Sequence, residues 1–99
     1  DTNLKNEIII IGAHYDHIGS AKKVGNDSIA NGANDNAAGA SGVLEIAEYF
    51  ASTKQNKRSI LIALFSAEEK GLKGAFHMAE RMKSEKVDLA YMINFEIDI

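Results

Sequence analysis

Three short apolar runs stand out along the chain, and each is followed by polar residues. Residues 7–12 and 60–65 are rich in isoleucine and leucine and are apolar on both faces, and residues 89–95 form a third run of similar length. Runs of this length that lack alternation are typical of strands covered on both sides, as in a parallel sheet. The sequence therefore predicts buried strands at 7–12 and 60–65 and a third strand at 89–95.

Between these runs the spacing of apolar residues changes to the period of a helix. From Asn36 onward the apolar positions follow a 3.6-residue repeat, and a second such stripe precedes the third strand. Residues 20–34 hold turn formers and little apolar content, which predicts a long loop. The stripes are Val43, Ile46, Ala47 and Phe50 in the first helix, and Leu72, Ala75, Phe76, Ala79 and Met82 in the second.

The predicted order is strand, long loop, helix, strand, helix, strand. Strands that alternate with helices favour a parallel sheet joined by right-handed crossovers, which is an α/β fold. The 99 residues, with 45% hydrophobic content, are enough for one small domain over residues 1–99. The start at Asp1 rather than Met suggests a processed or excised product.

Charge and composition exclude several classes of partner. The net charge of −3 leaves no basic footprint for nucleic acid and no polybasic patch for anionic lipid. No stretch approaches the roughly 20 apolar residues that cross a bilayer. The chain has no cysteine, so thiolate metal sites are excluded.

Side chains of the metal-binding type follow each predicted strand. In a parallel sheet the carboxyl ends of the strands meet at one edge, where ligands bind. Imidazole and carboxylate groups suit zinc or a similar divalent ion, and a carboxylate-rich site also suits two ions that share a bridging group. The candidates are His14 and Asp16 after the first strand, Asp35 at the start of the first helix, Glu68 and Glu69 after the second strand, and Glu96 at the end of the third.

Each candidate also has a purely structural interpretation. His14 and Asp16 point to the same side of an extended chain, so Asp16 either accepts the second ring N–H of a metal-binding His14 or shares a hydrated strand end with it. Asp35 could be a helix N-cap, although the small residues 37–42 suggest a close approach by another group. Of Glu68 and Glu69, one could bind a metal ion while the other acts as general base. In the structural interpretation, both are acids favoured at a helix N-terminus.

Four further residues are weaker candidates. Asp27 lies in ordinary turn composition. Asp98 shares a face with Glu96 if the third strand continues, and Glu96 is the better ligand because it is nearer the strand end. His17 could line a pocket or cap a loop, and His77 lies off the apolar stripe of its helix, which favours a solvated surface role.

Four segments together resemble one known family in order and spacing. Residues 14–19 (HYDHIG), 31–39 (NGANDNAAG), 66–74 (SAEEKGLKG) and 94–96 (NFE) are similar to motifs of the M28 family of zinc aminopeptidases. The resemblance implies a three-layer α/β sandwich with a mostly parallel sheet, a phosphorylase/hydrolase-like zinc peptidase core, of which this chain is the N-terminal part.

The resemblance also implies a role for each candidate. His14, oriented by Asp16, would bind the first of two zinc ions together with Glu96, where many members have Asp. Asp35 would bridge both ions and be followed by a cis peptide bond to Asn36. Glu69 would bind the second ion. Glu68 would be the general base. The implied set is therefore metal ligands His14, Asp35, Glu69 and Glu96, with Glu68 and Asp16 as the catalytic pair.

The implied activity is that of an aminopeptidase, in which water activated by two zinc ions hydrolyses the N-terminal bond of a peptide substrate. In the family a further histidine from downstream completes the second zinc site, so the chain is expected to be a piece of a longer domain. Two alternatives stay open: an inactive structural fragment, or a non-peptidase relative of the glutaminyl cyclase or receptor type. Bare sheet edges favour a homo-oligomer, and relatives are commonly secreted or periplasmic.

Overall fold

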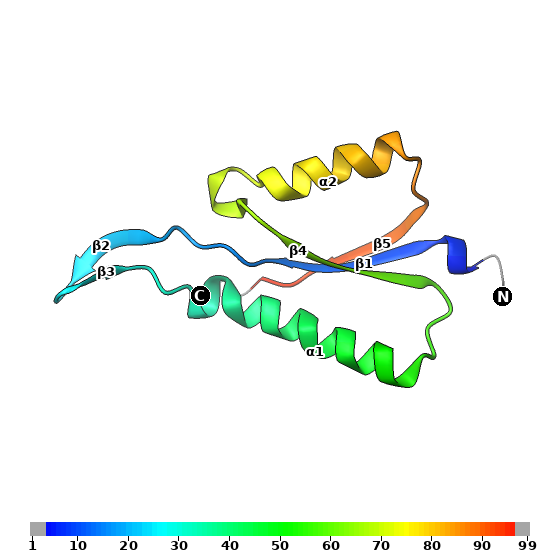
Figure 1. Ribbon diagram of the computed structural model, residues 1–99, viewed down its shortest axis with the longest axis horizontal. Coiled ribbons are helices and arrows are strands. Elements are labelled where there is room, and N and C mark those ends of the chain that lie inside the picture. The colour runs from blue at the N-terminus through cyan, green and yellow to red at the C-terminus, as the bar shows by residue number, and fades with distance from the viewer. Residues whose placement is uncertain (1–3, 97–99) are drawn as a thin grey trace.

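The main sheet consists of three parallel strands, with the first strand of the chain in the middle. The computed structural model describes residues 4–96, apart from the side chains of residues 21–24. The strands are β1 (Ile8–His14), β4 (Ser59–Phe65) and β5 (Leu89–Asn94), in the order β4, β1, β5. Helix α1 (Ala38–Thr53) lies against one face and α2 (Lys73–Ser84) lies on the other (Figure 1). The α/β three-layer arrangement predicted from the sequence is confirmed.

Alternate residues of β1 supply the two halves of the core. Ile10 packs with Ala63 and Phe65 on the side of α2, whereas Ile11 and Ala13 pack with Val43 of α1. This follows from the period of two in a strand, which sends neighbouring side chains to opposite faces. Each fully buried aliphatic side chain contributes about 1.5–3 kcal/mol, so β1 anchors both helices at once.

The three strands differ in burial. Residues Ile10–His14 of β1 are buried, but β4 is only partly buried, and every residue of β5 is exposed. The prediction of a buried strand thus holds for β1 and only in part for β4. The reason is position: β1 has a strand on each side and a helix on each face, whereas β4 and β5 are the outer strands of the described sheet.

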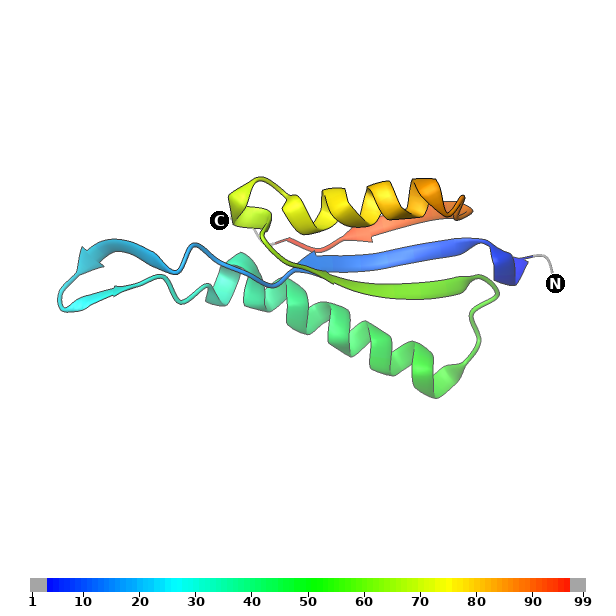
Figure 2. The same ribbon diagram turned by 45° about the horizontal axis from the view of Figure 1, so that its top comes forward.

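The predicted loop at residues 20–34 is corrected by the structure. Strands β2 (Ser20–Val24) and β3 (Asp27–Ile29) form an antiparallel hairpin within it, which projects from the body of the molecule (Figure 2). A two-residue turn joins them, and Gly25 adopts φ +62°, a conformation that glycine reaches without strain. The strands are short and poor in apolar residues, so the hydrophobic pattern did not reveal them.

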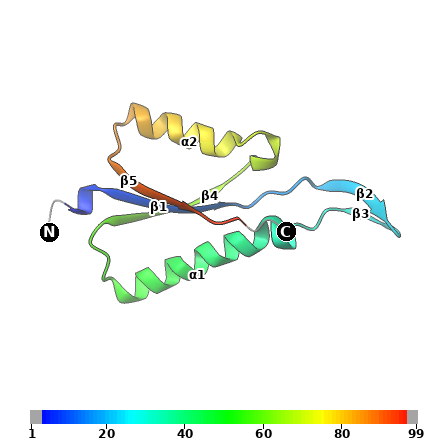
Figure 3. The ribbon, with the colours of Figure 1, turned by 180° about the vertical axis from the view of Figure 1, so that it is seen from behind.

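Short helical turns complete the chain. These are η1 (Leu4–Asn6), η2 (Ala33–Ala37) and η3 (Glu68–Lys70). Seen from behind, the start of α1 lies beside the end of β5 (Figure 3), and Asn36 Nδ2 donates to the Phe95 carbonyl at 2.9 Å there. No helix within residues 4–96 is both long and apolar enough to cross a membrane.

Candidate metal centre

The predicted ligands converge at the carboxyl edge of the sheet. His14 is the last residue of β1, Glu68 and Glu69 begin η3 directly after β4, and Glu96 lies two residues beyond β5. Asp35 reaches the same edge from η2, which precedes α1. The parallel pairing of the strands brings these residues together, because it sets His14 of β1 opposite Phe65 of β4 and Gly12 of β1 opposite Asn94 of β5.

His14 lies at the centre of this cluster. Its side chain is only 3% exposed, and Nε2 lies 3.0 Å from Asp35 Oδ1 and 3.6 Å from Glu96 Oε1. Glu68 Oε2 lies 3.7 Å from the same nitrogen. Ligand atoms of His14, Glu68 and Glu96 fall within 4.8 Å of one another, as do those of His14, Asp35 and Glu69. The structure thus brings the four predicted ligands and the predicted base into one cluster.

A second histidine enters the cluster from the other side of Asp35. His17 Nδ1 lies 3.5 Å from Glu69 Oε1 and 3.9 Å from Asp35 Oδ2. Each carboxylate oxygen of Asp35 therefore faces a different imidazole. The sequence had offered His17 only as a pocket or loop residue, although its position three residues after His14 was the available signal.

Four buried atoms of this cluster lack a hydrogen-bond partner among residues 4–96. They are His14 Nε2, His17 Nδ1, Asp35 Oδ1 and Glu69 Oε1. Buried polar atoms are ordinarily paired, and unpaired imidazole nitrogens beside carboxylate oxygens are the donor set that suits zinc. The residues present therefore fit divalent metal ions.

Asp16 supports the cluster in a different way from the one predicted. His14 Nδ1 donates to the Asp16 backbone carbonyl at 3.1 Å, whereas the Asp16 carboxylate is 3.5 Å from that nitrogen. A carbonyl can only accept, so Nδ1 carries the hydrogen and the Nε2 lone pair faces the carboxylates. The Asp16 side chain instead accepts the backbone N–H groups of Glu68 at 3.0 Å and Glu69 at 3.2 Å. It thereby fixes the turn that presents both acids.

Asn36 links three segments beneath the cluster. Its side chain, which is 1% exposed, donates to the His14 carbonyl at 3.1 Å and to the Phe95 carbonyl at 2.9 Å, and accepts the Gly39 N–H at 3.2 Å. The Asp35–Asn36 peptide bond is cis, as the family resemblance implied. Helix α1 begins after Ala37 with no side-chain cap, so the N-cap interpretation of Asp35 is wrong.

The comparisons with known proteins agree with this geometry. The family model described as peptidase family M28 matches residues 1–98. The chain belongs to peptidase family M28. It is 39% identical over 88 residues to a probable zinc metalloprotease of Pyrenophora tritici-repentis, covering 89% of this chain and 20% of that protein. It is 36% identical over 98 residues to the aminopeptidase YwaD of Bacillus subtilis, covering 98% of this chain and 19% of YwaD. The chain therefore spans about a fifth of the length of the curated relatives it matches.

Burial, neighbouring charges and hydrogen bonds shift the pKa values of three groups in and beside the cluster. Burial has the largest effect on His14 and lowers its pKa, but the negative charge of Glu68, the hydrogen bond to the Asp16 backbone and the charges of Asp35 and Asp16 together outweigh burial, so the pKa is raised. Burial also raises the pKa of Glu68, with further increases from its acidic neighbours, although the charge of His14 opposes them. For Asp16, burial would raise the pKa, but the backbone N–H groups it accepts lower it below its ordinary value.

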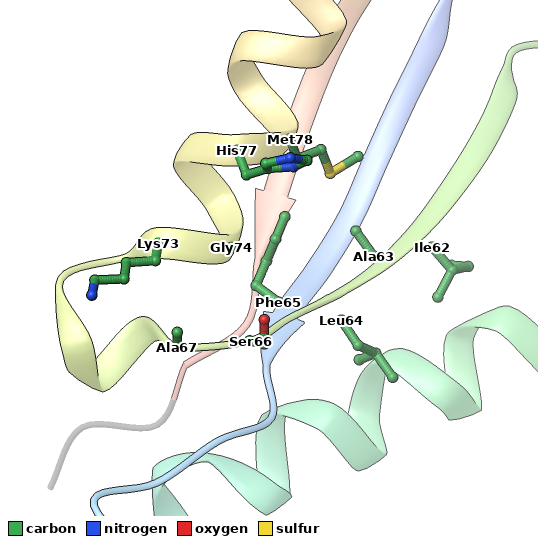
Figure 4. Close-up of a pocket in the computed structure, with 10 residues that line it drawn as sticks. All are labelled: Ile62, Ala63, Leu64, Phe65, Ser66, Ala67, Lys73, Gly74, His77 and Met78. Atoms are coloured by element: carbon green, nitrogen blue, oxygen red, sulfur yellow. The ribbon is translucent and has the colours of Figure 1, made fainter.

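A cavity of about 270 Å³ adjoins the cluster of candidate ligands. His14, Glu68 and Glu96 form its polar side, and its apolar wall includes Phe65, Leu72, Ala75 and Met92. A separate groove of about 550 Å³ runs between β4 and α2, where His77 and Met78 lie above Phe65 and Ser66 (Figure 4). The first cavity is thus the one that the candidate ligands line, whereas the described residues that line the second groove include no carboxylate.

The weaker candidates lie outside the cluster. Asp27 accepts the Ile29 N–H at 2.9 Å in the exposed hairpin, which is a turn role. His77 is exposed on α2, as expected for a surface residue. Asp98 lies outside the described residues.

Proposed function

We propose that the protein carrying these residues is a zinc-dependent aminopeptidase. The observation that carries the proposal is the cluster of unpaired, buried imidazole and carboxylate atoms at the carboxyl edge of the sheet. Membership of family M28 supports it, as do relatives named zinc metalloprotease and aminopeptidase. The substrate would be the N-terminal bond of a peptide.

The proposed ligands would form two sets that share Asp35. His14, Asp35 and Glu96 would hold one zinc ion, and Asp35 with Glu69 would hold another. When bound, such ions would supply Lewis acidity to the scissile carbonyl and lower the pKa of the attacking water. Asp35 would be the shared ligand, and the approach of its two oxygens to different imidazoles supports this role.

Glu68 is the proposed general base. Its side chain is 26% exposed and borders the cavity beside His14. The raised pKa of Glu68, caused first by burial, suits a group that must accept a proton and then release it. In the proposed step the water oxygen bonds to the carbonyl carbon and its proton passes to Glu68. The C–N bond then breaks as Glu68 returns that proton to the leaving amine.

The test is Glu68→Gln in the protein expressed at its full natural length. Glutamine keeps the shape but cannot accept the proton, so hydrolysis of aminoacyl arylamides should fall by about 10²- to 10⁴-fold. Zinc content, measured by elemental analysis, should stay at the wild-type value, because Glu68 is the base and not a ligand. The matched control is Glu80→Gln, which alters an exposed acid on α2.

Two outcomes would contradict this proposal. Activity of the Glu68→Gln variant within tenfold of wild type would remove Glu68 from the role of base. Cleavage of an N-acetylated substrate at the same rate as the free amine would remove the aminopeptidase assignment and leave a metallopeptidase of another kind.

A further inference from the structure

We propose that Gly74 is a positioning residue for Glu68. The start of α2 is hydrogen bonded to the two residues that precede Glu68, and a glycine at residue 74 lets the helix come that close. This inference rests on the proposed function, because it assigns a role to a residue that acts through the proposed base.

Two backbone hydrogen bonds close the turn that carries Glu68. The Gly74 N–H donates to the Ser66 carbonyl at 3.0 Å, and the Lys73 N–H donates to the Ala67 carbonyl at 3.1 Å. Figure 4 shows these four residues, two at the start of α2 and two just after the end of β4. Residues 68–72 therefore form a loop whose two ends are paired with each other.

The backbone of this loop is not one that local preference would maintain. Ala67 and Leu72 have φ angles of 55° and 59°, in the left-handed region that residues with a Cβ rarely adopt. Residues in such conformations persist where the surrounding structure holds them. The start of α2 holds one side of the loop, and the Asp16 carboxylate holds the other by accepting the N–H groups of Glu68 and Glu69.

Gly74 is the residue that permits the close approach of α2. A Cβ built there would lie 2.5 Å from the Ser66 carbonyl oxygen and 2.8 Å from the Ser66 nitrogen. These are backbone atoms, so no change of rotamer relieves the contact, and the start of the helix would have to move away from the end of β4. Since Ser66 and Ala67 directly precede Glu68, this movement would change the 3.7 Å distance between Glu68 Oε2 and His14 Nε2.

The helix itself does not require glycine at this position. Gly74 is the second residue of α2, and alanine ordinarily favours a helix over glycine. Gly42 of α1 is the matched control, because a Cβ there would meet nothing within 4 Å. Comparison of the two alanine variants therefore separates the loss of the close approach from the replacement of a helical glycine.

The experiment measures hydrolysis of an aminoacyl arylamide by the natural-length protein with zinc in excess. Misplacement by about 1 Å can cost about 10²-fold in rate, so Gly74→Ala should lower kcat and kcat/KM together by about 10- to 100-fold. Gly42→Ala should match wild type. Circular dichroism and thermal unfolding check that each variant is folded at the assay temperature.

A double variant tests whether Gly74 acts through Glu68. When Glu68→Gln has already removed the base, adding Gly74→Ala should lower kcat by no more than about threefold. If Gly74 had only a general structural role, the two losses would multiply. Multiplied losses would overturn the inference.

A further measurement on the metal-free wild type depends on no variant. Asp16 holds the N–H groups of Glu68 and Glu69, and those of Lys73 and Gly74 close the turn. If the turn and the helix start open as one unit, all four amide hydrogens should exchange with solvent at rates within about tenfold of one another, after correction for intrinsic rates. Faster exchange at Glu68 and Glu69 alone would overturn the inference.

The outcomes separate this inference from the function on which it rests. If wild type hydrolyses the arylamide and a folded Gly74→Ala variant keeps the wild-type kcat, the Gly74 assignment fails and the proposed function stands. If Gly74→Ala does not fold, the exchange rates of wild type decide. A wild type that does not hydrolyse the arylamide overturns both.

Discussion

Asn36 shows how one side chain can organise a site that it does not enter. It satisfies two backbone carbonyls and one backbone N–H at the junction of β1, β5 and α1, and it is 1% exposed. Its neighbours in the sequence and in space, Asp35 and His14, belong to the cluster that is proposed to bind metal. The amide therefore couples the fold of three segments to the placement of these side chains.

Replacement of Asn36 by alanine should be strongly destabilising. Each buried backbone group left without a partner costs about 1–3 kcal/mol, and Asn36 serves three. The free energy of unfolding from urea denaturation should fall by several kcal/mol. The control is Asn56→Ala, which removes an exposed bond to the Arg58 carbonyl and should cost no more than about 1 kcal/mol. A loss at Asn36 as small as the control would contradict this account.

Two glycines on one helix should respond in opposite directions to alanine. A Cβ at Gly39 would collide with the Asn36 side chain, whereas a Cβ at Gly42 meets nothing within 4 Å. Gly42→Ala should stabilise the protein by up to about 1 kcal/mol through helix propensity. Gly39→Ala should destabilise it, because Asn36 would have to move. Thermal unfolding measures both, and a stabilising Gly39→Ala would show that the Asn36 contact is unimportant.

At the scale of elements, η3 depends on a residue from a distant segment. Asp16, just beyond β1, accepts two N–H groups at the start of η3, so the turn that carries Glu68 and Glu69 is held to the end of the central strand. The lowered pKa of Asp16 reflects these bonds, which outweigh the effect of burial. The charged form of Asp16 is thus the form that stabilises the fold.

The stabilisation from Asp16 should depend on pH in a defined direction. A carboxyl group whose folded pKa is lowered stabilises the fold above its unfolded pKa of about 3.9, and this contribution is lost as pH falls through the folded pKa. Asp16→Asn should therefore be less stable than wild type at pH 6–7, and the difference should shrink below pH 4. Urea denaturation of both proteins across pH measures this. A difference that stays constant with pH would contradict the role of the charge.

At the scale of the molecule, the described sheet has one inner strand and two outer ones. Strand β1 lies between β4 and β5, while apolar side chains of β5 remain 41–65% exposed at Leu89, Tyr91, Met92 and Ile93. Such edges and faces favour association. Pairing between copies of the chain stays a prediction from the sequence.

Metal binding should stabilise the whole fold, because the centre joins all three strands and η2. An ion that binds only the folded state stabilises it by about 2.7 kcal/mol at a free concentration 100 times the Kd. Removal of zinc with a chelator should therefore lower the Tm of the natural-length protein, and added zinc should restore it. His14→Ala should remove most of this response. Identical Tm values with and without zinc would contradict a metal centre at this edge.

The sequence by itself determined what is local or repeated along the chain. The types and order of the main helices and strands followed from periodicity, and the candidate ligands, such as His14 and Glu69, followed from the residues after each strand. Motif order also predicted the family, which the family model confirms. The short hairpin at residues 20–29 was not predicted, because its few residues show no clear periodicity of apolar positions.

The tertiary structure decided which atoms meet. Strand order and register placed His17 against Glu69, turned the Asp16 carboxylate toward η3, and made Asn36 a link between β1 and β5. These contacts join residues from segments far apart along the chain, so no local pattern encodes them. Burial was decided in the same way: similar apolar runs became an inner strand at β1 and an exposed outer strand at β5, because only their neighbours in the sheet differ.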